Sequence, residues 1–166
     1  MMSGGWMNMT MYKVKKLLAL LSLCLIVSSV QAGEPVSKSF FSGVAIDGHD
    51  TVAYHKVGAT DPHKAAKGSK SWKAKWKGAT WLFTTEVDRD LFAADPEYYS
   101  PAYNGHCANA LSLGEGLIKT DGTHWQIFED KLYTFYAARG RDRWLDGNFK
   151  QYKVAADKAW SEIISQ

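Results

Sequence analysis

The sequence feature that most constrains the fold is an alternation of large apolar and basic side chains over residues 72–77. Tryptophan, alanine and tryptophan occupy the even positions of this segment, and lysine occupies each odd position. Successive side chains on a strand point to opposite faces, so the pattern predicts a β-strand with one aromatic face and one lysine face. After Gly78-Ala79, the segment Thr80-Trp81-Leu82-Phe83 predicts the second strand of a hairpin. We expect the aromatic face to pack on the core; a platform on which a ligand stacks is the alternative.

Short helices are predicted on either side of this hairpin. Residues 43–48 predict a brief strand closed by a turn, and Asp50 is suited to cap a helical turn over residues 51–55. Thr84-Thr85 begins a second helix, which Asp95-Pro96 ends. The face of this helix that we expect to be buried carries Val87, Leu91 and Phe92.

The remaining segments predict a loop, a second hairpin and two further helices. The polar, lysine-bearing run from Lys56 to Lys70 is broken by glycine and proline, which indicates an exposed loop. Residues 124–128 and 131–135 predict the second hairpin. Residues 139–146 predict a short helix, and the apolar spacing from Phe149 to Ile163 predicts a closing amphipathic helix. Together these elements predict a compact single α+β domain with two β-hairpins, short helices and a C-terminal amphipathic helix.

Length and composition favour one domain with a core built on aromatic rings. A chain of 166 residues can bury one substantial core and is too short for two domains that each have a stable core. Aromatic residues make up 13% of the chain and include seven tryptophans, so we expect large flat side chains to dominate the interior.

The N-terminal segment has the pattern of a secretory signal peptide. Lys13-Val14-Lys15-Lys16 supplies a basic start, residues 17–30 are largely apolar, and Val30-Gln31-Ala32 offers a cleavage site. The apolar run is shorter than the roughly 20 residues that span a bilayer. We therefore expect residues 1–32 to be a cleaved signal peptide, with no stable membrane anchor after cleavage and a periplasmic or secreted mature protein.

Removal of this leader changes both the charge and the sulfur chemistry. Three of the 20 lysines and arginines lie in the leader, which leaves 17 basic residues against 17 acidic ones. The mature chain has no overall field that would attract nucleic acid, so we expect no nucleic-acid partner. It keeps one cysteine, Cys107, and no methionine, which excludes an internal disulfide and the thioether-rich sites of many copper carriers.

The aromatic segment around Cys107 is the first candidate for a functional site. Cys107 follows His106, and a thiolate beside an imidazole suits Cu(I) or Zn(II). A closed metal site needs further ligands, and no two histidines show metal-ligand spacing. The possible suppliers are His49, Asp50, His55, His63 and His124. The alternative for Cys107 is a buried thiol that packs as a small hydrophobic side chain.

Four ordered segments of the mature chain form a recognisable set. They are residues 48–54 (GHDTVAY), 77–83 (KGATWLF), 92–99 (FAADPEYY) and 105–108 (GHCA). Together they resemble the YHS domain family, in particular its exported single-domain bacterial members. The resemblance implies a compact α+β domain related to small metal-binding modules, and it places His49 and Asp50 in a matching segment.

The resemblance also implies domain boundaries and reveals one departure. It implies a YHS-like core over residues 43–113, with residues 114–166 as the C-terminal hairpin and helices of the same domain. The metal-binding relatives carry cysteines on the hairpin and at the start of the following helix, whereas residues 84–88 of this chain contain no thiol. That ligand set is absent, so metal binding is not carried over from those relatives.

Three classes of function remain open from the sequence. The first is a non-enzymatic module that binds a transition metal, Cu or Zn, through Cys107, His106, His49 and Asp50. The second is a small-molecule or protein-interaction domain whose aromatic pocket is lined by Tyr54, Tyr99, Tyr103 and Trp72. The third is a thiol-dependent redox enzyme, which lacks an identifiable base because adjacent side chains diverge. The sequence contains neither the common enzyme signatures nor a haem attachment motif.

Overall fold

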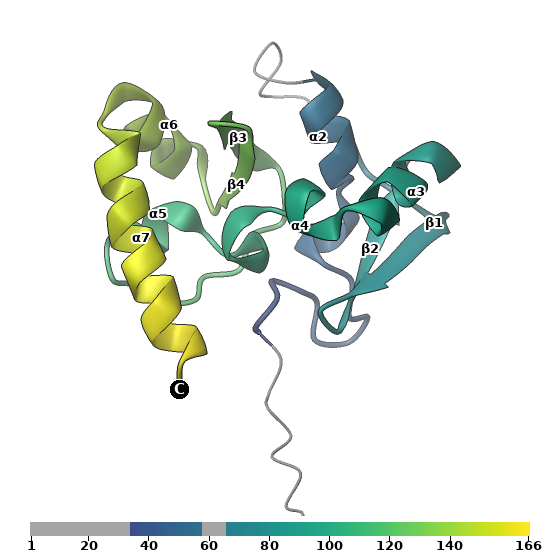
Figure 1. Ribbon diagram of the computed structural model, residues 1–166, viewed down its shortest axis with the longest axis horizontal. Helices are drawn as coiled ribbons and strands as arrows, with labels where there is room; N and C mark the ends of the chain where they lie inside the picture. The colour runs from purple at the N-terminus through teal and green to yellow at the C-terminus, as the bar shows by residue number, and fades with distance from the viewer. Residues whose placement is uncertain (1–33, 58–65) are drawn as a thin grey trace, which may run out of the picture. The chain divides into compact units, whose positions relative to one another are not determined.

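The computed structural model describes residues 34–57 and 66–166, which form a single α+β domain (Figure 1). The helices are α2 (Thr51–Val57), α3 (Glu86–Ala94), α4 (Pro96–Tyr99), α5 (Ala108–Ser112), α6 (Ala138–Asp146) and α7 (Phe149–Ile164), with the 3-10 turns η1 (Ile46–Gly48) and η3 (Ala102–Gly105). The strands are β1 (Ser69–Trp76), β2 (Ala79–Phe83), β3 (His124–Phe128) and β4 (Lys131–Phe135). The predicted signal peptide and residues 58–65 of the predicted lysine-bearing loop lie outside the described residues.

The first hairpin is confirmed. Strands β1 and β2 pair antiparallel, with Ala74 opposite Trp81 and Trp76 opposite Ala79. The even positions of residues 72–77 are half-buried against the core, and Lys73 and Lys75 between them are exposed. The alternation predicted this strand correctly, because successive side chains of a strand point to opposite faces, and only one face of this hairpin packs on the core.

The brief strand predicted over residues 43–46 is reduced to isolated bridges. Val44 pairs with Thr80 of β2, and Ala45 pairs with Lys38. The Ala45 amide donates to the Thr80 carbonyl at 2.9 Å, and the Thr80 amide donates to the Gly43 carbonyl at 2.8 Å. The chain then enters η1 at Ile46, so this segment lies beside β2 without continuing as a strand.

Both predicted N-caps are confirmed, but the predicted buried face of α3 is wrong. Asp50 Oδ1 accepts from the amides of the first turn of α2, and Thr85 accepts from the Asp88 amide at the start of α3. Val87 is 62% exposed and Leu91 is 37% exposed, whereas Phe92 is fully buried. The buried face carries Asp88 with Phe92, because polar partners satisfy the Asp88 carboxylate inside the domain.

The second half of the domain also matches the predicted elements. Strands β3 and β4 pair antiparallel from His124 opposite Phe135 to Phe128 opposite Lys131. Helix α6 ends at Asp146, with Gly147 as its C-cap, and α7 packs Trp160 on the core. Helix α7 lies against α5 (Figure 1).

The core consists of three clusters rich in aromatic rings, as the composition predicts. One cluster holds Trp81, Phe83 and Phe92 of the first hairpin and α3. A second holds Trp144, Tyr133 and Phe135 with α5 and α7, and a small third joins Tyr54 to Trp125. All three lie within residues 33–166, so this unit has its own core. Across the described residues, no helix combines the length and apolar character needed to cross a bilayer.

Candidate functional site

Cys107 lies where three segments of the domain meet. Its amide donates to the Ile118 carbonyl at 2.8 Å, and its backbone forms a parallel bridge with Thr134 of β4. The turn before it requires glycine, because Gly105 has φ +83° and a Cβ there would lie 2.6 Å from Ile46 Cγ2. Cys107 is also the N-cap residue of α5. These contacts fix the thiol by backbone pairing on both sides.

Cys107 is among the residues that line a cavity of about 400 Å³, although only 4% of the residue is exposed. The Tyr136 amide donates a hydrogen bond to Sγ over 3.3 Å. Polar groups in the same cavity come from Asn109 on α5, from Glu115 and from Arg139 at the start of α6. Cys107 is therefore buried by area, yet it is one of the residues that line this cavity, together with charged and amide-bearing residues.

Asn109 is held in one orientation by an arginine of α6. Arg143 Nη1 donates to Asn109 Oδ1 at 2.8 Å, and the same guanidinium lies 3.7 Å from the ring centroid of Tyr152. With its oxygen engaged, Asn109 presents its amide nitrogen as the remaining donor. Gly140 packs against this side chain, since a Cβ at that position would lie 3.1 Å from Asn109 Cβ.

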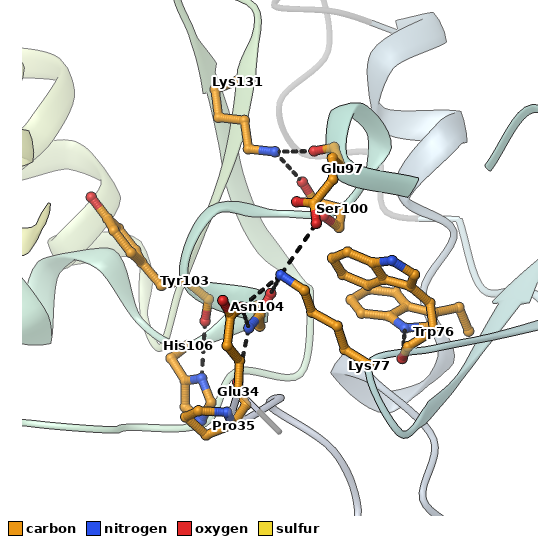
Figure 2. Close-up of polar contacts among 11 residues, drawn as sticks. Glu34, Pro35, Trp76, Lys77, Glu97, Ser100, Tyr103, Asn104, His106 and Lys131 are labelled. Atoms are coloured by element: carbon orange, nitrogen blue, oxygen red, sulfur yellow. Dashed lines mark hydrogen bonds and ion pairs between the residues drawn. The ribbon is translucent and has the colours of Figure 1, made fainter. Parts of the chain in front are cut away.

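His106 lies in a different cavity from Cys107, although the two residues are adjacent. Its cavity measures about 600 Å³ and is lined by Glu34, Lys38, Lys77 and Lys119 among others. Figure 2 shows His106 Nδ1 bonded to the Tyr103 carbonyl, a contact of 3.0 Å. Since a carbonyl only accepts, Nδ1 carries the proton and Nε2 keeps its lone pair. Burial lowers the pKa of His106, and the positive charge of Lys119 lowers it further. The hydrogen bond to the Tyr103 carbonyl raises this pKa and so opposes part of the effect.

Lys77 closes one side of the His106 cavity with a small polar network. Its Nζ lies 2.6 Å from Glu34 Oε2, and the same ammonium is 3.4 Å from both Asn104 Oδ1 and Glu97 Oε1 (Figure 2). Hydrogen bonds from Lys77 and Asn104 hold the pKa of Glu34 below its usual value. This lysine is thus partly neutralised by acids.

His49 and Asp50 are both buried and both engaged by the protein. His49 Nδ1 lies 2.6 Å from the Asp121 carbonyl oxygen and 3.2 Å from the Ile46 carbonyl oxygen. Asp50 accepts from the Val52 and Ala53 amides through Oδ1 and from the Thr84 amide and hydroxyl through Oδ2. Burial raises the pKa of Asp50. Its carboxylate joins α2 to the start of α3, which is a structural role.

The four predicted metal ligands therefore do not converge as a set. Within residues 34–57 and 66–166, no three His, Cys, Asp or Glu side chains are grouped so as to hold a metal ion. His106 and Cys107 line separate cavities, and Asp50 has hydrogen bonds to both carboxylate oxygens.

The four predicted pocket aromatics are also distributed over the domain. Tyr54 donates its hydroxyl to the Gly122 carbonyl at 2.6 Å and stacks on Trp125. Tyr103 donates to Asp157 Oδ1 at 2.8 Å in the second cluster. Trp72 and Tyr99 pack against the first cluster. Each ring contributes to packing in its own cluster.

Sequence reasoning missed the polar residues that share the Cys107 cavity. Tyr136 and Arg139 have no recognisable spacing to Cys107, because they reach its cavity through the pairing of β4 and the packing of α6. Glu115 reaches the same cavity from the turn after α5, where its amide donates to the Ala110 carbonyl. Asn109 lies two residues after Cys107, and its position in the first turn of α5 was the one available signal.

Comparisons with protein-family models, with curated proteins and with solved structures give no match. What the Cys107 cavity can bind must therefore be inferred from the residues that line it. These offer a soft sulfur, a guanidinium, a carboxylate and an amide donor in one space. This combination can bind a small polar organic molecule or, through the sulfur, a soft metal ion.

Proposed function

We propose that the mature chain is an exported binding module that takes a small organic molecule bearing a carboxylate into the cavity at Cys107. The observation that carries this proposal is that Cys107, Asn109, Glu115 and Arg139 line one cavity of about 400 Å³. That volume lies within the range of about 300–1,000 Å³ that is usual for small-molecule sites. The proposal corresponds to the small-molecule alternative predicted from the sequence, with a different set of residues.

The charges around the cavity favour a carboxylate over a neutral ligand. Arg139 is exposed and makes no ion pair with any described acid, so its guanidinium can bind a carboxylate with two hydrogen bonds. Helix α6 begins at Ala138, which adds the positive end of the helix dipole on the same side. Glu115 gives the cavity one acidic position, which can receive a donor group of the ligand.

The environment of the thiol favours binding over catalysis. The hydrogen bond that Sγ accepts comes from the Tyr136 backbone, and the described residues place no histidine or carboxylate in hydrogen-bond contact with it. Nucleophilic catalysis by a thiol ordinarily uses such a base. We therefore assign Cys107 a contact role on the cavity wall.

A transition metal, Cu or Zn, remains a second candidate ligand, favoured by one observation. His49 and His106 each direct Nδ1 at a backbone carbonyl, as metal-binding histidines commonly do. The described residues hold no group of three metal ligands, so such an ion would need further donor atoms from a small molecule bound together with it. The relationship to the YHS family is likewise proposed on the four matching sequence segments alone.

Selective alkylation of Cys107 tests the carboxylate-binding cavity. Iodoacetate and iodoacetamide differ mainly in the negative charge of the first, and Cys107 is the one thiol of the mature protein. We expect both reagents to modify the native protein, and Arg139→Gln to lower the rate ratio of iodoacetate to iodoacetamide by about threefold or more. Lys150→Gln, a charge change on the exposed face of α7, should leave the ratio unchanged.

Two results would contradict the proposal. One is a thiol that reacts only after denaturation, and the other is a ratio that Arg139→Gln does not alter. The metal candidate is tested separately by titrating the purified protein and Cys107→Ala with Cu(I) and Zn(II). Stoichiometric binding that Cys107→Ala abolishes would favour the metal over the carboxylate ligand.

A further inference from the structure

Two phenylalanines project from a tight turn with almost their whole surface in solvent. Phe40 is 89% exposed and Phe41 is 97% exposed, and their rings contact each other edge to face at a centroid distance of 5.4 Å. Turns of this kind ordinarily carry glycine or short polar residues. Two adjacent apolar rings at the tip of a turn indicate a contact made with something outside the domain.

The turn is fixed by hydrogen bonds. The Ser39 amide donates to the Val44 carbonyl at 2.9 Å, and the Gly43 amide donates to the Ser39 carbonyl at 3.0 Å. Ser39 Oγ and Ser42 Oγ accept further amide bonds within the turn. The Gly43 carbonyl also accepts a hydrogen bond from the Thr80 amide of β2. The backbone that carries both rings is thus part of the sheet framework.

Three lysines with free positive charge surround the base of this turn. Lys38 Nζ donates to the Gly78 carbonyl, Lys75 Nζ donates to Thr80 Oγ1, and Lys119 Nζ donates to the Lys38 carbonyl. Each of these acceptors is neutral, and the described acids form no ion pair with any of the three.

The acids near the turn leave this positive charge largely intact. Asp47 is paired with Lys67, and Glu34 is paired with Lys77. Asp121 lines the cavity that Lys38 and Lys119 also line, and it is bonded to Thr123. The basic groups therefore exceed the unpaired acids at this end of the domain.

We propose that the Phe40-Phe41 turn inserts into the interface of a membrane that carries anionic phospholipids. Inserted rings would remove apolar surface from water, while the lysines behind them would contact phosphate groups. The arrangement of rings at the tip and cations at the base matches the order of acyl chains and headgroups in a bilayer.

Area argues for a membrane over a second copy of the chain. Two phenylalanines can bury at most about 500 Å² between them. A stable protein interface buries about 1,200–2,000 Å² with complementary shape on both sides. A bilayer interface needs no matching pocket, so two protruding rings suffice for reversible binding. This inference is independent of any ligand at Cys107.

Vesicle binding of the mature chain from Gly33 tests the proposal. We expect it to co-sediment with vesicles of phosphatidylcholine and phosphatidylglycerol, more weakly with phosphatidylcholine alone, and less as salt is added. Phe40→Ala with Phe41→Ala should lower the partition coefficient at least about tenfold. The matched control is Val87→Ala with Val154→Ala, which removes two other exposed apolar side chains and should have no effect.

The charge contribution is tested by Lys75→Gln with Lys119→Gln, which should remove most of the salt dependence. Lys150→Gln with Lys158→Gln on α7 is its control. Thermal melts should show each variant folded, since the altered side chains are solvent-exposed or at the surface. Absence of vesicle binding, or binding that the double phenylalanine variant retains, would overturn the proposal. So would a concentration-dependent dimer that this variant abolishes.

Discussion

At the scale of single residues, burial gives a structural role to side chains that the sequence offered as candidate ligands. Asp50 was a predicted metal ligand, and its two oxygens receive four hydrogen bonds that cap α2 and hold the start of α3. Thr84 Oγ1 also lies 2.9 Å from Asp88 Oδ2, and Lys56 pairs with Asp88. A buried carboxylate with all its acceptor positions used is expensive to expose and poorly suited to bind a ligand.

His55 is the residue through which pH should most directly alter stability. Its ring lies 4.8 Å from that of Tyr98 and 5.4 Å from that of Tyr99, and its Nε2 is buried with no hydrogen-bond partner among the described residues. Burial, with the charge of Lys131, lowers the pKa of His55 from 6.5 to about 4, although Asp130 opposes this. The folded state therefore binds fewer protons than the unfolded state between these values.

We predict that the free energy of unfolding decreases as pH falls from about 6.5 to about 4, because protonation favours the unfolded chain in that window. His55→Phe keeps an aromatic ring in place and removes the titration. It should reduce this loss by about 1–2 kcal/mol, measured by urea denaturation at several pH values. His106, whose pKa burial also lowers, should leave a slope of the same sign. An unchanged pH dependence in the variant would contradict the prediction.

At the scale of elements, close backbone approaches decide where strands begin. Gly68 lies next to the end of β2, and a Cβ there would lie 2.5 Å from the Phe83 nitrogen and 2.6 Å from the Leu82 oxygen. Its own amide donates to the Gly48 carbonyl at 2.8 Å. The predicted loop from Lys56 to Lys70 therefore ends earlier than expected, with β1 beginning at Ser69.

We predict that Gly68→Ala destabilises the domain by about 2–3 kcal/mol, because backbone atoms of β2 would have to move. Gly114→Ala is the matched control, since a Cβ there meets nothing within 4 Å and φ is +73°. It should cost about 1 kcal/mol from backbone strain alone. Denaturant unfolding of both variants measures the loss in free energy of unfolding. Equal losses in the two variants would show that the close approach of Gly68 to β2 does not contribute to stability.

At the scale of the whole molecule, the distribution of charge matters more than its sum. The 17 basic and 17 acidic residues after Ala32 balance, yet three unpaired lysines gather beside the phenylalanine turn. A neutral protein can thus present a positive face to an anionic surface. The leader proposed for residues 1–32 would deliver that face to an exported compartment.

We predict that the exported protein begins at Gly33. Expression of the full chain followed by intact-mass analysis of the periplasmic or secreted fraction measures this directly. Lys15→Glu with Lys16→Glu should reduce export, because the basic start of a signal peptide is removed. A full-length mass in the mature fraction, or export unaffected by the charge change, would count against the leader.

Much of the fold followed from local patterns. The alternation over residues 72–77, the caps at Asp50 and Thr85 and the spacing along α7 each depend on neighbours within a few positions. The wrong face of α3 shows the limit of this reasoning. Val87 and Leu91 have apolar character, but the partners that bury Asp88 come from α2 and from Thr84.

The sequence by itself therefore determined the element types, the ring-rich core and the identity of the one thiol that follows residue 32. Only the tertiary structure decided that Cys107 shares a cavity with Arg139 and Glu115 while His106 faces another. It also decided that Phe40 and Phe41 lie outside the core. The physical reason is that local periodicity sets backbone conformation, whereas a cavity or a surface is made by segments that meet through long-range pairing and packing.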